Sequence, residues 1–480
     1  MNDPREFHLL HSRRKLLGEM AGGIGALALG DLFSREGYAA TAGKRTDPLA
    51  PKAPHFPGKA KSVIFLFMEG GPSQMDLLDP KPELKKYHGQ PAPASMTSKL
   101  QLAFTKPNAA ILASSREFKK YGQSGIEFSD WLPYMAQNAD DMCVVRSMYS
   151  EAFNHHPAQL MLFTGTQQFG RPTMGAWTLY GMGSESDSLP GFVVLSSGVG
   201  TSGGATNFSS GFLPSTYQGT LLRSSGDPIL YLSNPNGVTP HGQRAVFDAV
   251  RDLNQAKLDD TGDLEIASRM ASYELAYRMQ TAGPELTDLS KESPETLEMY
   301  GVNDEKTKQF GTNCLLARRL VERGVRFILL MDASWDSHTN LNTKLKDNCA
   351  KTDRGAGALV KDLKQRGLLD STLVVWGGEF GRTPMSEVRN TADADNAGRD
   401  HHPVAYSMWL AGGGIKGGQV VGKTDDLGFF ITEDKVHIHD LQATMMHCLG
   451  FDHTRLSYRF MGRDFRLTDI AGNVVKKMLV

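Results

Sequence analysis

Short apolar runs alternate with segments of helical periodicity over most of the chain after residue 60. Six of these runs are five to seven residues long and are bounded by polar or glycine-rich segments, as buried parallel strands are. They are residues 62–68, 144–148, 192–196, 326–331, 372–376 and 405–411. Helical spacing of apolar residues marks segments 264–281, 312–323, 354–366 and 439–449. The alternation predicts an α/β fold with a mostly parallel central sheet and helices on both faces.

Two stretches follow this alternation less clearly, from about 80 to 135 and from about 200 to 300. We expect them to be insertions, or a cap over one end of the sheet. The prediction is one large domain over residues 61–480, because neither a repeat nor a long low-complexity tract divides it.

The N-terminus has the features of an export signal. Arg13 and Arg14 stand in the sequence SRRKLL, a weakly apolar run follows at 21–29, and small residues precede candidate cleavage points at Ala40 and Ala42. We interpret residues 1–42 as a twin-arginine signal peptide and the proline-rich segment 43–60 as a linker. The alternative is a chance basic pair ahead of a small helix. The apolar run is too short for a stable membrane span. The signal therefore predicts export through the twin-arginine machinery to the periplasm, without a membrane-spanning helix.

Composition narrows the function. The chain has 480 residues, with 52 Lys and Arg against 53 Asp and Glu, for a net charge of -1. Such a balance argues against nucleic acid or an anionic membrane as the main partner. The cysteines, at positions 143, 314, 349 and 448, form no CxxC pair and favour neither a disulfide framework nor a zinc–cysteine site.

Polar residues gather directly after three of the predicted strands. Glu69 and, in the following loop, Asp76 come after 62–68, Asp336 and His338 come after 326–331, and Glu379 and Arg382 come after 372–376. Ligands of open parallel sheets bind outside the carboxyl ends of the strands. Carboxylates and an imidazole there suit a divalent cation, and an arginine can hold an oxyanion by paired hydrogen bonds. A Gly/Pro turn with a solvated acid is the alternative for Glu69 or Asp76.

Two histidine pairs lie at other borders. His155 and His156 precede a helix-like run, and His401 and His402 precede the apolar run 405–411. Imidazole is the commonest metal ligand in proteins. Because adjacent residues point apart, one histidine of a pair is expected to serve the site and the other its surroundings.

The segment GGQVVGKT at 417–424 matches the phosphate-loop pattern. A phosphate loop needs a buried strand before it and a helix starting at the lysine, but here a glycine-rich turn precedes the segment and DDLG follows. Nucleotide binding there is not expected.

Several of these motifs resemble the alkaline phosphatase superfamily. The run from Asp353 to Arg382, with LLDSTLVVWGGEFGR, is similar to the helix, strand and metal-binding pair of sulfatases. HHPAQLMLFTG at 155–165 resembles their nucleophile segment, and IHDLQATMMHCLG resembles a late sulfatase helix. The motifs GGPS, NHHPA, WDSH, GGEFGRTP and GRDHHP together most resemble the bacterial domain-of-unknown-function 1501 family. The resemblance implies an alkaline-phosphatase-like fold with cap insertions.

The chain departs from the sulfatase pattern at three points. Ala158 and Gln159 stand where the nucleophile segment of sulfatases continues with Ser–Arg. His155 stands where a sulfatase has its nucleophilic Cys or Ser. Glu379 and Phe380 stand where sulfatases have a metal-binding Asp–His pair, and Phe380 cannot bind a metal. Either one metal site is lost, or its ligands come from elsewhere, with His155, His401 and His402 as candidates.

These observations predict an exported, metal-dependent hydrolase of phosphate or sulfate esters. A divalent metal (zinc, calcium or manganese) would be held by residues from the candidate set Glu69, Asp76, Asp336, His338, Glu379, His401 and His402. The candidate catalytic residues are His155, His156 and Arg382, where His155 either attacks phosphorus or binds the metal while water attacks. The alternative is a degenerate relative that binds an anionic glycan or an envelope partner without turnover. The missing nucleophile and Phe380 favour that alternative, whereas the retained histidines and carboxylates disfavour it, because unused buried charges are costly.

Overall fold

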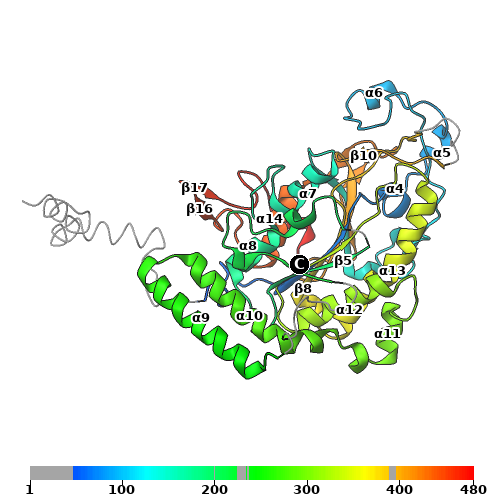
Figure 1. The fold of residues 1–480 in the computed structure, drawn as a ribbon. Helices are drawn as coiled ribbons and strands as arrows, with labels where there is room; N and C mark the ends of the chain where they lie inside the picture. Colours follow the sequence, from blue (N-terminus) through cyan, green and yellow to red (C-terminus); the bar gives the residue numbers. More distant parts are fainter. Residues whose placement is uncertain (1–46, 199, 224–233, 235–236, 389–395) are drawn as a thin grey trace, which may run out of the picture. The chain divides into compact units, whose positions relative to one another are not determined.

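The computed structural model describes residues 47–198, 200–223, 234, 237–388 and 396–480. The predicted signal peptide, residues 1–42, and the first residues of the predicted linker lie outside the described residues. All elements below belong to the compact unit Pro48–Val480 (Figure 1).

A central sheet of nine strands organises the described part of this unit. Its order is β12-β4-β11-β8-β1-β7-β5-β6, and β15 also pairs with β4. The bounds are β1 Ser62–Met68, β4 Met142–Tyr149, β5 Phe192–Ser197, β6 Thr220–Leu222, β7 Phe327–Asp332, β8 Thr372–Gly377, β11 Tyr406–Ala411, β12 Gln419–Val421 and β15 Val436–His437. Strand β11 is antiparallel to β8 and β4, and the other pairs are parallel. The predicted mostly parallel sheet is therefore confirmed.

Helices cover both faces of the sheet (Figure 1). Along β1, Val63, Phe65 and Phe67 join one core cluster, whereas Ile64, Leu66 and Met68 join another, so alternate side chains fill opposite cores. The first cluster includes residues of α7 (His155–Thr164), α8 (Met174–Met182) and α14 (Ile438–Cys448). The second includes residues of α12 (Lys308–Glu322) and α13 (Leu341–Gln365). This burial on both sides explains why the strands are continuously apolar in sequence.

The two weakly patterned stretches contain smaller elements and a long helical pair. Between 80 and 135 lie α5 (Leu84–Tyr87), α6 (Ala94–Thr97) and the hairpin β2 (Phe118–Tyr121) and β3 (Ile126–Ser129). Between 200 and 300 lie α9 (Pro240–Thr261), α10 (Leu264–Thr287) and α11 (Pro294–Tyr300). The remaining short elements are α4 (Gln74–Leu77), β9 (Gly381–Arg382), β10 (His401–His402), β13 (Lys423–Thr424), β14 (Ile431–Glu433), β16 (Tyr458–Phe460) and β17 (Arg463–Phe465).

Several sequence expectations can be followed in the fold. The helix expected from 354 begins at Leu341, after Asn340 in the left-handed conformation (φ 55°). Lys423 lies in β13 rather than at a helix start, as expected for a segment that is not a phosphate loop. The four cysteines are buried and form no disulfide. Among the described helices, none combines the length and apolarity that a membrane span requires.

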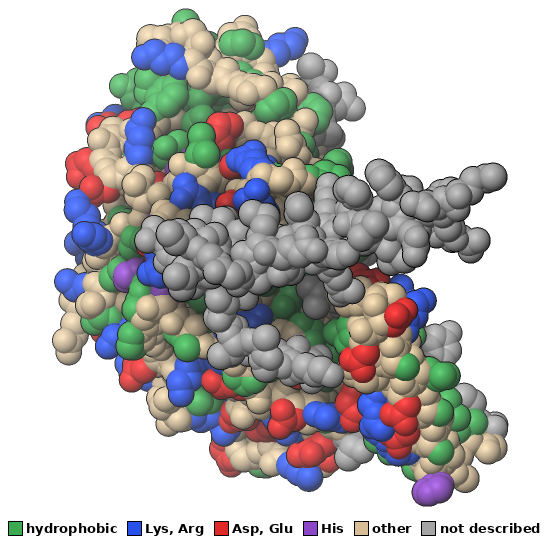
Figure 2. Space-filling view, turned by 90° about the vertical axis from the view of Figure 1, so that its left-hand side faces the viewer, with side chains coloured by type: hydrophobic (Ala, Val, Ile, Leu, Met, Phe, Trp, Pro, Cys, Tyr) green, Lys and Arg blue, Asp and Glu red, His purple; other side chains and the backbone are tan. Residues whose placement is uncertain are grey.

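Residues 47–60 form no helix or strand but are tied to the domain by backbone hydrogen bonds. The N–H groups of Lys52, Phe56 and Ala60 donate to the carbonyls of Met182, Gly450 and Cys448. On the face shown in Figure 2, acidic and basic side chains are interspersed, and neither sign dominates a large area of the described residues.

Candidate metal centre

The carboxyl ends of β1, β7 and β8 lie side by side. Met68 pairs with Asp332, and Phe67 pairs with Gly377, so the loops that follow begin at one edge of the sheet. Gly70, with φ 113°, lets the first loop pass so close to the second that a Cβ there would lie 2.3 Å from the Asp336 nitrogen. The Gly70 N–H donates to both carboxylate oxygens of Glu379, in the third loop, at 3.1 and 3.2 Å. The loops thereby fix one another.

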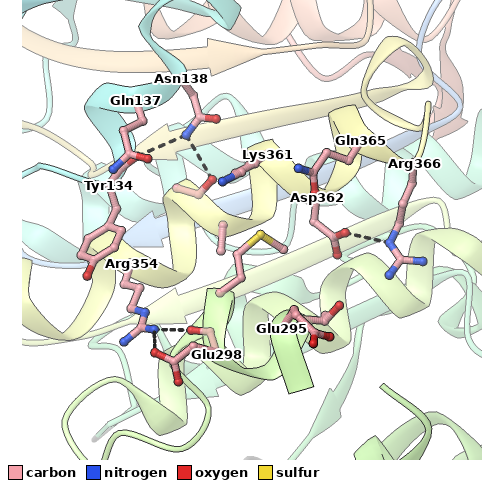
Figure 3. A pocket seen from close by; sticks show the side chains of 14 residues that line it. Tyr134, Gln137, Asn138, Glu295, Glu298, Arg354, Lys361, Asp362, Gln365 and Arg366 are labelled. Carbon is pink, nitrogen blue, oxygen red and sulfur yellow. Dashed lines mark hydrogen bonds and ion pairs between the residues drawn. The ribbon is translucent and has the colours of Figure 1, made fainter. Parts of the chain in front are cut away.

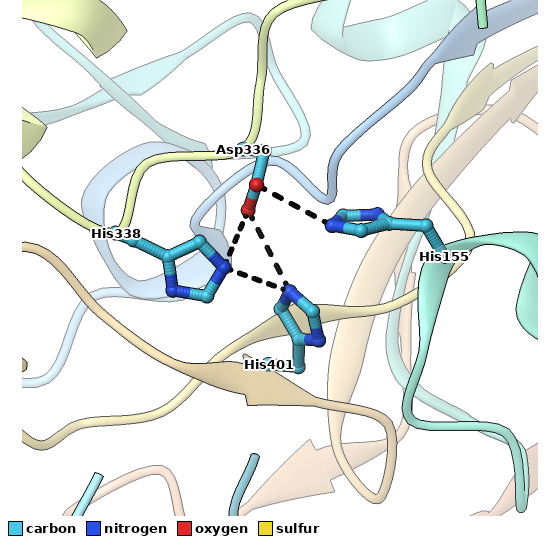
Figure 4. A group of neighbouring side chains, drawn as sticks. All are labelled: His155, Asp336, His338 and His401. Atoms are coloured by element: carbon cyan, nitrogen blue, oxygen red, sulfur yellow. Dashed lines mark hydrogen bonds and ion pairs between the residues drawn. The ribbon is translucent and has the colours of Figure 1, made fainter. Parts of the chain in front are cut away.

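Four side chains from three segments, the start of α7, the loop after β7 and β10, meet at this edge (Figure 4). One ligand atom each of His155, Asp336, His338 and His401 lies within 4.8 Å of the other three. Asp336 is central: its Oδ1 lies 2.9 Å from His338 Nε2 and 3.6 Å from His401 Nε2, and its Oδ2 lies 3.4 Å from His155 Nε2. The Nε2 atoms of His338 and His401 are 3.0 Å apart.

The other nitrogen of each of these imidazoles contacts an oxygen atom outside the cluster. His155 Nδ1 lies 2.7 Å from Glu379 Oε1, and His338 Nδ1 lies 2.5 Å from Glu387 Oε2. His401 Nδ1 lies 2.7 Å from the carbonyl oxygen of Phe153. Each Nδ1 therefore has an acceptor for its proton, and each Nε2 faces Asp336, to which it donates when the imidazole is protonated; a bound cation would take the place of that proton. Metal-binding histidines are oriented in this way by their outer partners.

The spacing of the Nε2 and carboxylate atoms fits a small divalent cation. Ligands about 2.0–2.2 Å from a tetrahedral zinc ion stand roughly 3.3–3.6 Å from one another. Four of the separations, 2.9 to 3.6 Å, are close to that range, and all four ligand atoms lie within 4.8 Å of one another. Two Nε2 lone pairs at 3.0 Å repel unless a cation or a proton lies between them.

The ionisation of the cluster follows from burial and from Asp336. Burial lowers the pKa of His155, but hydrogen bonds to Asp336 and Glu379 outweigh it and raise that pKa to about 9. The same balance, with Asp336 and Glu387, raises the pKa of His338. For His401, burial prevails and lowers the pKa. Burial would raise the pKa of Asp336, yet its histidine and Arg382 neighbours hold it well below its ordinary value.

Two further predicted ligands lie beside His155. A ligand atom of Glu69, one of Glu379 and one of His155 fall within 4.8 Å of one another. Glu379 is buried and accepts the Gly70 N–H. Glu69 Oε1 accepts hydrogen bonds from Gln159 Nε2 at 3.0 Å and from the backbone of Ser202 at 3.2 Å. Glu379 therefore orients His155, whereas Glu69 is bound to α7 through Gln159; with His155 they form a second group close enough to hold a metal ion.

The structure does not bring Asp76, His402 and His156 into the cluster. Asp76 is buried in an ion pair with Arg399, whose Nε lies 2.9 Å from Asp76 Oδ2. His402 Nε2 contacts the Phe429 carbonyl at 2.9 Å, and burial lowers the pKa of His402 to about 4. His156 Nε2 contacts the Thr206 hydroxyl at 3.2 Å. Each of these side chains therefore contacts a partner outside the cluster.

Arg382 lies beside the cluster, but most of its hydrogen bonds go to backbone carbonyls. Its guanidinium is fully buried and donates to the carbonyls of Gly70, Gly71 and Arg399, and to Asp336 Oδ1 at 2.5 Å. Most of its donors are therefore engaged with the chain, and its contact with the centre is through Asp336.

Phe380 fills the position that the sequence comparison gave to a metal-binding histidine. Its ring lies nearly parallel to that of His401, with centroids 4.3 Å apart, and 5.0 Å from that of His155. It packs the two imidazoles from one side.

Two residues that contact the histidine cluster were not identified from the sequence. Glu387 lies in a weakly patterned segment, and only its contact with His338 identifies it. Asp400 stands beside His401 in the GRDHHP motif, which gave a signal, but it was not assigned a role. Its Oδ2 accepts the backbone N–H groups of Ala103, Phe104 and Thr105 at 2.8 to 3.0 Å. Burial would raise the pKa of Asp400, but these hydrogen bonds outweigh burial and lower that pKa.

The contact with Glu387 gives a testable prediction. Replacing Glu387 by Gln should raise the dissociation constant for zinc by about 10- to 100-fold, because a neutral amide holds the Nδ1 proton of His338 less firmly. Titration calorimetry on metal-free protein measures this. Glu151→Gln is the matched control: Glu151 pairs with His437, which lies outside the cluster, at 2.9 Å. An unchanged affinity in Glu387→Gln would contradict the outer role of Glu387.

A surface groove of about 700 Å³ lies elsewhere, between α11, α13 and the 3-10 helix η1 (Met135–Asp141) (Figure 3). Two ion pairs lie within its wall: Arg354 with Glu298, and Arg366 Nε with Asp362 Oδ1 at 2.8 Å. None of the residues that line it belongs to the histidine cluster.

Comparisons with known proteins agree with the motifs. A family model described as "Protein of unknown function (DUF1501)" matches residues 60–479, which confirms the family resemblance drawn from the sequence. No curated protein matches the chain.

Three solved structures illustrate what the chain is similar to. A sulfatase from Pseudoalteromonas sp. is 12% identical, with 89% of this chain and 71% of that chain covered and a TM-score of 0.35. A phosphonate monoester hydrolase from Silicibacter pomeroyi is 10% identical, with 81% and 73% covered and a TM-score of 0.35. An alkaline phosphatase from the Antarctic bacterium TAB5 is 12% identical, with 79% and 97% covered and a TM-score of 0.27.

Proposed function

The chain belongs to the DUF1501 family, and we propose that this member hydrolyses phosphate or sulfate esters with the help of a divalent metal. One observation carries the proposal: His155, Asp336, His338 and His401 converge from three segments at the carboxyl edge of the sheet. The proposed ligands replace part of the set expected from the sequence, since Asp76 and His402 are engaged elsewhere.

The ligand atoms favour particular metals. Three imidazole nitrogens and one carboxylate suit zinc, and manganese less closely. Calcium prefers six to eight oxygen ligands, so it is the least suited of the three metals considered.

A bound divalent cation would polarise the ester oxygen and lower the pKa of a water molecule. The chain's own groups decide where the ester approaches. The side chains of Asp336 and His155 are 39% and 21% exposed, whereas those of His338 and His401 are nearly buried. The open side of the centre is therefore the side of Asp336 and His155.

The contacts of His155 and Arg382 favour one of the two roles that the sequence allowed for each. His155 keeps Nδ1 on Glu379 and directs Nε2 to the cluster, which supports a role as ligand rather than nucleophile. Arg382 donates to three carbonyls and to Asp336, which supports a role in positioning Asp336 rather than in holding an oxyanion.

We also propose that the protein acts in the periplasm after export by the twin-arginine machinery. This part rests on the sequence of residues 1–42 alone.

The test is an assay of purified protein, stripped with a chelator and reconstituted with zinc or manganese. We expect the reconstituted protein, but not the stripped one, to release para-nitrophenol from para-nitrophenyl phosphate or para-nitrophenyl sulfate. His401→Ala, treated in the same way, should release none. Protein that holds the metal but cleaves neither ester would contradict the proposed hydrolase.

That contrary outcome would support a second function, binding of an anionic glycan or envelope partner without turnover. Two observations favour it: α7 starts with His155, which has no hydroxyl, and Phe380 packs against the cluster in place of a ligand. Binding of a sulfated glycan by the metal-loaded protein would be the measurement.

A further inference from the structure

An aromatic side chain stands beside the cluster at the surface. The ring of Phe104 lies perpendicular to those of His338 and His401, with centroid distances of 5.0 and 6.1 Å. Phe104 is nevertheless 60% exposed. Part of an apolar ring therefore faces solvent next to two of the proposed ligands.

The backbone at Phe104 is held firmly although its ring is exposed. Its N–H and those of Ala103 and Thr105 converge on Asp400 Oδ2, at 2.8, 3.0 and 2.9 Å. Asp400 Oδ1 accepts the N–H of His401 at 2.8 Å, and Asp400 itself is buried. One buried carboxylate thus fixes both the aromatic residue and the neighbouring histidine of the centre.

This anchoring separates Phe104 from an ordinary exposed apolar residue. Single exposed hydrophobic side chains are common and carry no meaning by themselves. The backbone of Phe104 is held by three charge-assisted hydrogen bonds, and its side chain stays 60% exposed while it packs against two of the proposed ligands. Phe104 packs against His338, whose Nε2 is 2.9 Å from Asp336, the most exposed of the proposed ligands, so the ring borders the side from which the ester is proposed to approach.

We infer that Phe104 determines substrate specificity by packing against a ring on the alcohol side of the ester. The inference rests on the proposed function and narrows it: the substrate class is an ester whose alcohol carries an aryl or a saturated, sugar-like ring. Aromatic side chains of binding pockets supply such apolar contact, while a few polar groups fix orientation.

Binding of phosphonates tests this inference. Their P–C bond is not an ester bond, so an ester hydrolase does not cleave it and binding can be measured without turnover. Calorimetry on zinc-loaded protein compares methylphosphonate, which has no ring, with phenylphosphonate and cyclohexylphosphonate. We expect the wild type to bind at least one ring compound about 3- to 10-fold more tightly than methylphosphonate. The ring that is preferred distinguishes an aryl from a sugar-like alcohol. Phe104→Ala should abolish the preference, Phe104→Tyr should keep it, and both should retain the wild-type zinc content.

Three results would overturn the inference. In the first, Phe104→Ala keeps the preference for a ring compound. In the second, Phe104→Ala binds all three phosphonates equally weakly and loses zinc, which would give Phe104 a structural role only. A zinc-loaded wild type that binds none of the phosphonates would overturn the inference, whereas the proposed function is decided separately by the para-nitrophenyl phosphate and sulfate assay.

Discussion

Replacing Asp336 by Ala should give a folded protein that no longer holds a divalent metal. Asp336 is the one carboxylate among the four proposed ligands and lies 2.9 to 3.6 Å from all three Nε2 atoms. Removing an outer residue costs about 10- to 100-fold in metal affinity, so loss of this central ligand should cost about 1,000-fold or more. Elemental analysis should find near-stoichiometric metal in the wild type and little in the variant.

The variant should remain folded for a structural reason. Buried Arg382 loses its carboxylate partner, so the free energy of unfolding should fall, but Arg382 keeps three backbone acceptors and the side chain removed is 39% exposed. Asp332→Asn is the matched control, because Asp332 lies at the same strand end but accepts from Trp335 Nε1 and lies outside the cluster. The control should retain its metal. A fully loaded Asp336→Ala would contradict the site.

The sequence predicted the edge of the sheet at which the site lies, for a reason visible in the fold. Loops after parallel strands share one edge, which brings Asp336 and His338 near Glu379. His401 stands before its strand, not after it. It still reaches the same edge because β11 is antiparallel to β8, so β11 begins where β8 ends. Strand direction could not be read from the apolar run 405–411 alone.

The choice within each histidine pair also depended on tertiary contacts. Neighbouring residues point apart, which predicted that one histidine of a pair would serve the site. His402 is held by the Phe429 carbonyl and His156 by Thr206, and neither partner has a recognisable sequence signal. Glu387 was missed for the same reason: it lies 49 residues from His338 in the sequence. The sequence thus contained the residue types of the site but not their partners.

Asp76, a candidate ligand in the sequence analysis, lies in a buried ion pair instead of the cluster, and its replacement by Asn should destabilise the fold strongly. Asp76 and Arg399 are both buried, and the carboxylate also accepts from the Ser73 hydroxyl at 2.5 Å. Loss of one partner leaves the Arg399 charge buried without its counter-ion, which costs about 3–5 kcal/mol. Denaturant unfolding should show a fall of this size in the free energy of unfolding of Asp76→Asn.

A double variant separates the ion pair from a metal role. Replacing both partners, Asp76→Leu with Arg399→Met, removes the uncompensated charge and should recover much of the lost stability, because apolar pairs often replace buried ion pairs at little cost. The folded fraction of Asp76→Asn should keep its metal, since Asp76 is outside the cluster. Wild-type stability together with loss of metal in Asp76→Asn would instead make Asp76 a ligand. Stability and metal content, measured on the same samples, therefore decide whether this carboxylate holds the fold or the metal.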